Sequence, residues 1–166
     1  MFAIASSEFQ RSKWQTIVTG TLAFWLSSSL LLDFVVMPGM YTAGMMTEPG
    51  FATAGYSIFW IFNRIELVCA AIALTGLLVL RTTRPTVNQL TAFALGLGLF
   101  LFAVSLIYTY GLTPEMSALG LQLDLFQPSA EVPAAMDQMH QEYWLLELLK
   151  LGASGALLGL CWNKQV

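Results

Sequence analysis

Seven polar side chains of the kinds that bind ions or carry protons stand in or beside long apolar runs of this sequence. They are Asp33, Asn63, Arg64, Glu66, His140, Glu147 and Lys150. An ionisable group inside a membrane costs about 3 kcal/mol on insertion scales, so each one needs a partner or a use. They form either buried ion pairs that set the helix register, or a polar site open to the outer face for a proton, an ion or a small solute.

The charges of this set can neutralise one another in pairs. Asp33 and either Glu147 or Glu66 can pair with Arg64 and Lys150. Two acids then balance two bases without any ligand, and we favour this interpretation. It leaves Glu66, the acid nearest the middle of the membrane, without a base.

One stripe of the last apolar run carries several of these groups. His140, Tyr143, Glu147 and Lys150 follow one another at i, i+3, i+7 and i+10. This spacing confines them to one narrow face of a helix. We therefore expect that face to point polar groups into the protein.

Methionines gather close to the only histidine. The residues that could form a soft-metal site are Met40, Met45, Met46, Met136, Met139 and His140. Thioethers select Cu(I), and imidazole accepts copper as well. However, one histidine makes a poor metal site, and methionine is also a flexible apolar filler for irregular interfaces. We favour packing and keep a Cu(I) site as the alternative.

No arrangement of residues points to catalysis or to another cofactor. The sequence contains no nucleophile elbow, P-loop, zinc-protease motif or dinucleotide glycine pattern. A single histidine excludes bis-histidine haem in a monomer and leaves only His/Met ligation through His140. No basic stripe for nucleic acid is present. We therefore expect a non-enzymatic protein without a cofactor, unless copper is bound.

Composition and run length define the elements that must position these groups. Charged residues make up 10% of the chain, against about 25% in soluble domains, so most of the surface does not face water. Four apolar runs are long enough to cross a bilayer as helices. They cover roughly 17–37, 56–80, 90–110 and 143–162. We predict an all-α, four-span bundle that forms a single domain over residues 1–166.

The distribution of basic residues predicts the orientation. The segments 39–55 and 111–142 contain no Lys or Arg, whereas both ends of the chain and the segment 81–89 do. Because basic residues remain inside, both termini are expected in the cytoplasm, with the protein in the cell inner membrane or an equivalent internal membrane. The long outer segment 111–142 is expected to contain helical pieces lying at the interface.

Small residues recur on two of the spans and predict close helix packing. They are Ala92, Ala94, Gly96, Gly98, Gly152, Ala156 and Gly159. Such residues let helices approach within one bundle or between copies of a protein. We expect the protein to contact the lipid bilayer. The small-residue faces also allow a membrane-protein partner or a homo-oligomer.

Four short motifs carry a resemblance to a known family. They are DFVVMPGMY (33–41), AGYSIFWIFNRIE (54–66), YGLTPEMSALG (110–120) and MDQMHQEYWLLELLKL (136–151). With these motifs the chain resembles small four-span membrane proteins of the family catalogued as domain of unknown function 4149, related in pattern to the transmembrane-protein-205-like proteins. The resemblance implies a four-helix membrane fold and no activity. It draws attention to Pro38, Asn63, Pro114 and His140.

Two features of the sequence determine the expected function. Several helix faces carry small residues, and no set of residues resembles a catalytic site. We expect a small integral membrane protein that serves as an accessory or assembly subunit of a membrane complex. The alternative is a transporter or a Cu(I)-handling membrane protein with a polar site open to the extracytoplasmic side.

Overall fold

The regular elements of the protein are helices throughout the part of the chain that the structure describes. The computed structural model describes residues 2–45, 48, 50–83, 89–126 and 134–163. The elements are α1 (Phe2–Leu31), η1 (Leu32–Val36), α2 (Met37–Thr42), α3 (Phe51–Thr82), α4 (Gln89–Ile107), η3 (Tyr108–Leu112), α5 (Thr113–Phe126) and α6 (Ala134–Trp162). The two η elements are single π-helical turns that join α-helices into longer rods.

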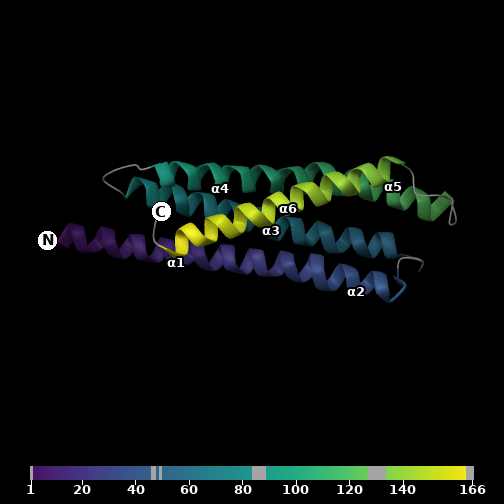
Figure 1. Cartoon of the computed structure of the whole chain (residues 1–166), viewed down its shortest axis with the longest axis horizontal. Coiled ribbons are helices and arrows are strands. Elements are labelled where there is room, and N and C mark those ends of the chain that lie inside the picture. The colour runs from purple at the N-terminus through teal and green to yellow at the C-terminus, as the bar shows by residue number, and fades with distance from the viewer. Residues whose placement is uncertain (1, 46–47, 49, 84–88, 127–133, 164–166) are drawn as a thin grey trace.

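Four rods lie side by side and make up the molecule (Figure 1). The first is α1–η1–α2, the second is α3, the third is α4–η3–α5 and the fourth is α6. In Figure 1, α6 crosses the others obliquely: it starts beside α5 and finishes near α1. The start of α1 and the finish of α6 therefore lie at the same end of the bundle.

Each rod contains a helix long and apolar enough to cross a membrane. These stretches are Phe9–Thr42, Thr53–Thr82, Gln89–Gly120 and Gln138–Trp162. The predicted all-α fold with four spans is confirmed in this respect. The helices extend well beyond the predicted spans, and α2 does so even through Pro38 and Gly39. In the segment after residue 110, the predicted helical piece is present as α5, but it continues the third rod rather than standing apart.

The side chains that face outward are apolar on every rod. Phe34, Val68, Phe93 and Leu148 come from different rods, and each is more than half exposed. In water such a surface would be strongly unfavourable, whereas lipid tails are as apolar as these side chains. The spans therefore contact the lipid bilayer.

Close approach between rods depends on Gly76 more than on the predicted small residues. A Cβ at Gly76 would collide with Cγ2 of Val18, so α1 and α3 lie together only because Gly76 has no side chain. Gly98 serves α4 in the same way, since a Cβ there would lie 2.8 Å from Leu77 Cδ1. By contrast, a Cβ at Gly96 or Gly152 would meet nothing within 4 Å. The predicted small-residue packing is thus confirmed at Gly98 and wrong within the bundle at Gly96 and Gly152.

Candidate functional site

Four ionisable side chains from three rods meet in the closed centre of the bundle. Asp33 comes from η1, Glu66 from α3, and Glu147 and Lys150 from α6. None is more than 4% exposed. We call these four residues the buried charge cluster. The cluster contains three acids and one base, so it is not neutral when all four groups are ionised.

Lys150 is the base that connects two of these acids. Its Nζ forms an ion pair with Oε1 of Glu66 on α3, and another with Oε2 of Glu147 at 2.8 Å. Glu147 and Lys150 lie on the same face of α6 because they are three residues apart. The predicted pairing of Lys150 with Glu147 or Glu66 is confirmed, and both acids share it.

Glu66 is the best-satisfied acid of the cluster. Its Oε1 accepts hydrogen bonds from Nε1 of Trp25 at 2.8 Å and from Oγ of Ser29 at 2.9 Å, besides the ion pair with Lys150. One carboxylate thus connects α1, α3 and α6. The prediction that Glu66 lacks a base was wrong. The overlooked signal was the i, i+4 spacing of Trp25 and Ser29, which continues to Asp33 at i+8 and gives α1 a polar face.

Arg64 does not take part in the cluster, although the sequence allowed it to balance an acid there. Its Nη1 donates to the carbonyl oxygen of Trp60 at 3.0 Å, and its guanidinium carbon lies 3.5 Å from the centre of the Trp60 ring. Among the described residues it makes no ion pair. Arg64 follows Asn63 by about 100° around the helix, so it points out of the bundle when Asn63 and Glu66 point in. The predicted pairing of Arg64 was wrong.

Asp33 and Glu147 place two carboxyl groups against each other. The groups face each other closely enough that a proton on either would complete an O–H···O hydrogen bond. Oδ2 of Asp33 and Oε1 of Glu147 are buried and accept no hydrogen bond from the described residues. Both oxygens are therefore acceptors without a donor among the described residues, although the Tyr108 hydroxyl also interacts with the Glu147 carboxylate.

Aromatic rings line the cluster on one side. Tyr108 and Tyr143 are stacked with ring centres 4.9 Å apart, and Phe59 meets Tyr143 edge-on at 5.9 Å. The Tyr108 hydroxyl donates to the carbonyl oxygen of Tyr143 at 3.1 Å, and Nζ of Lys150 lies 5.2 Å from the Tyr108 ring centre. Because these rings pack over buried charges, the cluster is closed on this side, as the favoured interpretation of buried ion pairs implies and the alternative of a site open to the outer face does not.

Asn63 belongs to a second polar contact one turn along α3. Its Nδ2 donates to Oγ1 of Thr113 at 2.6 Å and, at 3.5 Å, to the carbonyl oxygen of Tyr108. Oγ1 of Thr109 lies 3.3 Å from the carbonyl oxygen of Asn63, while its shorter hydrogen bond, at 2.7 Å, goes to the carbonyl oxygen of Ser105. Asn63 therefore fastens α3 to η3 and the start of α5, and it does not contribute to the charge cluster directly.

The predicted soft-metal residues are divided between two rods. Met40 lies in α2 of the first rod and Met45 just after it, whereas Met139 and His140 lie near the start of α6. Figure 1 shows α2 and the start of α6 on opposite sides of that end of the bundle. The side chains of Met46 and Met136 lie outside the described residues. No group of three His, Cys, Asp or Glu suited to a metal occurs among the residues described. The Cu(I) site remains a prediction.

Comparison with known proteins adds no relative to this picture. No protein-family model matches the chain, and neither the curated proteins nor the solved structures yield a match. The resemblance to domain of unknown function 4149 therefore stays a prediction. Fold and site together define an integral membrane protein with four spans and a closed, acid-rich charge cluster.

Proposed function

We propose that this protein is a non-enzymatic integral membrane protein that takes up and releases a proton between Asp33 and Glu147. This assigns it to the transporter class of the two classes expected. The observation that carries the proposal is the contact of these two buried carboxyl groups, whose oxygens Asp33 Oδ2 and Glu147 Oε1 accept no hydrogen bond from the described residues.

Electrostatics favours a shared proton at this contact. If all four groups of the cluster are ionised, three negative charges face one positive charge in a region away from water. Burying an uncompensated ion costs several kcal/mol even after relaxation. Two adjacent carboxylates avoid that cost by holding one proton between them, as paired acids in enzymes do.

Lys150 links the protonation state of Asp33 and Glu147 to the contacts between the helices. It contacts both Glu66 and Glu147, so the charge on Glu147 affects how the ammonium group divides its attraction between them. Glu66 keeps Trp25 and Ser29 as donors to its Oε1 in either state, whereas its buried Oε2 has no hydrogen-bond partner among the described residues. Loss of the shared proton would draw Lys150 toward Glu147 and away from α3. This is a means of coupling protonation to helix movement.

Infrared spectroscopy in lipid tests the site. A protonated carboxylic acid absorbs in a C=O stretching band that shifts in deuterated water and disappears on ionisation. We expect this band in the wild-type protein near neutral pH, its loss in both Asp33→Asn and Glu147→Gln, and its retention in Glu115→Gln, which alters an exposed acid on α5. Absence of the band, or a band unchanged in both variants, contradicts the proposal.

Vesicles that enclose a pH-sensitive dye test the transport class separately. A pH gradient across vesicles containing wild-type protein should collapse faster than across empty vesicles, and Asp33→Asn should abolish the difference. A carboxylic acid band without any flux would mean a static proton, and would remove the protein from the transporter class.

A second candidate, the expected accessory or assembly subunit, is favoured by Arg64. This cation lines a cavity of about 450 Å³ on the outside of the bundle, together with Phe24, Trp60, Ile65 and Val68. Arginine inside a membrane usually pairs with an acid or with backbone carbonyls. A transmembrane helix of another protein or of a second copy, bearing a carboxylate, would satisfy Arg64 there.

Purification from native membranes distinguishes the two candidates. An accessory subunit should retain a stoichiometric partner in the wild-type protein, lose it in Arg64→Leu, and keep it in Arg81→Leu, which removes an exposed arginine at the other end of α3. Isolation of every variant as a single chain would contradict this second role.

The proposed orientation places both termini in the cytoplasm, in an inner or equivalent internal membrane. It is supported by Arg11, Lys13 and Arg81 at one end of the described helices and by Glu48 and Glu115 toward the other. A cysteine introduced at Ser12 should react with an impermeant thiol reagent only after the cells are opened. A cysteine at Glu115 should react in intact cells, and the reverse pattern would overturn the orientation.

A further inference from the structure

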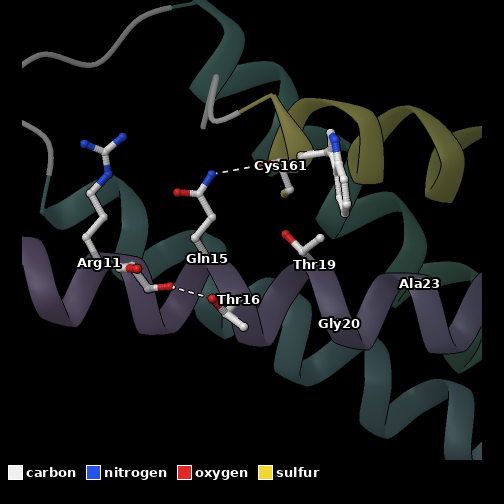
Figure 2. A pocket seen from close by; sticks show the side chains of 9 residues that line it. Arg11, Gln15, Thr16, Thr19, Gly20, Ala23 and Cys161 are labelled. Atoms are coloured by element: carbon white, nitrogen blue, oxygen red, sulfur yellow. Dashed lines mark hydrogen bonds between the residues drawn. The ribbon is translucent and has the colours of Figure 1, made fainter.

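A cavity of about 850 Å³ lies between α1 and the last turn of α6, at the end of the bundle opposite the methionines. Its lining includes Arg11, Gln15, Thr19, Gly20 and Trp162 (Figure 2). Volumes of this size are typical of sites for small molecules. The cavity is far along α1 from Asp33 and takes no part in the charge cluster.

One half of the cavity is polar and, among the residues that the structure describes, carries a single charge. Arg11, Gln15 and Thr19 recur at i, i+4 and i+8, and Figure 2 shows all three projecting from the same side of α1. Gln15 donates from Nε2 to the carbonyl oxygen of Cys161 at 2.8 Å, which ties α1 to the last turn of α6. Arg11 is the one charged residue in the lining, and its buried Nε has no hydrogen-bond partner among the described residues.

The other half of the cavity is apolar and open. It continues along α1 past Gly20 to Ala23. A Cβ at Gly20 would meet nothing within 4 Å, so no neighbouring helix fills this space. From Arg11 to Ala23 the helix rises roughly 18 Å. That is about the thickness of half a bilayer's hydrocarbon core plus part of the headgroup layer.

We infer that this cavity binds one anionic phospholipid, with its phosphate at Arg11 and an acyl chain beside Gly20 and Ala23. The polar and apolar halves follow the order of groups in a lipid, and the described residues of the lining include a cation and no acid. Basic pockets between helices at this level of a membrane bind anionic headgroups. Trp162, which is 76% exposed, is of the type that sits at the headgroup level.

The experiment is native mass spectrometry of the protein released from bilayer discs of equal phosphatidylglycerol and phosphatidylcholine. We expect one retained phosphatidylglycerol per chain in the wild-type protein. Arg11→Gln should lower its retention about fivefold. Lys13→Gln removes the same charge from an exposed side chain whose Nζ lies 4.2 Å from the Phe9 ring centre, outside the cavity lining, and should leave retention unchanged.

Gly20→Phe tests the acyl half without changing any charge. The new ring occupies the open space beside α1, so lipid retention should be lost while the melting temperature stays that of the wild type. Equal retention of phosphatidylcholine, an equal effect of Lys13→Gln, or full retention in Arg11→Gln would overturn the inference. Retention in a folded Gly20→Phe protein would also overturn it.

Discussion

Pro38 and Pro114 occupy equivalent positions, since each is the second residue after a five-residue π-helical turn, Leu32–Val36 in one case and Tyr108–Leu112 in the other. A proline has no N–H, and its ring clashes with the carbonyl four residues earlier. That carbonyl belongs to Phe34 or to Tyr110, the middle residue of each π turn. Both turns close instead with i to i−5 hydrogen bonds, from Met37 to Leu32 and from Thr113 to Tyr108.

These two turns contribute residues to the polar interior. The first carries Asp33, and the second carries Tyr108 and Thr109. Because a π turn holds one residue more than an α turn, it rotates the next helical segment by about 100°. The prolines therefore set where the polar groups of the first and third rods point.

Removing Pro114 should uncouple Asn63 from Thr113. In the wild-type protein, Thr113→Val should lower the free energy of unfolding by about 0.6–1.7 kcal/mol, the range for hydrogen bonds between membrane helices. In a Pro114→Ala background the π turn can revert to an α turn, which rotates Thr113 away from Asn63. We expect the cost of Thr113→Val to fall to nearly zero there, as measured by thermal unfolding in detergent. An undiminished cost would mean that the proline does not position Thr113.

The fold was readable from the sequence because membrane spans need long apolar runs. All four runs appear as helices, and the antiparallel arrangement of α3 and α4 follows from the short connection between them. The helix ends were not readable, since hydropathy reports where lipid begins and not where backbone hydrogen bonding stops. Thus α5 continues α4 through η3, although the third span was predicted to end near residue 110.

The sequence predicted only part of the buried charge cluster. The i, i+3 spacing of Glu147 and Lys150 placed them on one face of α6, and they do form an ion pair. The partners across helices depend on rotations that sequence spacing leaves open. Sequence spacing therefore predicts neither the outward direction of Arg64 nor the donors Trp25 and Ser29 to Glu66. The π turn that carries Asp33 has no sequence signal except Pro38.

The ion pair of Lys150 and Glu66 should show strong coupling in a double-mutant cycle. Glu66→Gln or Lys150→Met alone leaves a buried charge without its partner, and each should cost about 3–5 kcal/mol of unfolding free energy. The combined Glu66→Gln/Lys150→Met protein should lose less than the sum of the two changes. Lys13→Met, at an exposed position, serves as the control and should unfold as the wild type does. Additive losses would show that the contact is not an energetic unit.

Gly76→Ala should destabilise the bundle by forcing α1 and α3 apart. The new Cβ collides with Val18, and such overpacking typically costs about 1–3 kcal/mol. Val18→Ala in the same chain should recover part of the loss, because it removes the colliding methyl group. Gly152→Ala is the matched control, since its Cβ meets nothing within 4 Å. A melting temperature lowered equally by both glycine substitutions would contradict the role of Gly76.

The predicted Cu(I) site can be decided by titration of the reduced protein against a competing chelator. Thioethers and one imidazole hold Cu(I) only when several converge on the ion, whereas α2 and the start of α6, which carry Met40 and His140, lie on opposite sides of the bundle end in Figure 1. We therefore expect no binding above the detergent blank.

The matched variant for this titration is Met136→Leu/Met139→Leu/His140→Ala, which keeps the volume of two apolar side chains and removes the one imidazole. It should titrate as the wild-type protein does. Tight one-to-one binding that this variant loses would contradict the packing interpretation of these methionines. Such binding would make copper the ligand and identify the start of α6, rather than the buried charge cluster, as the functional end of the molecule.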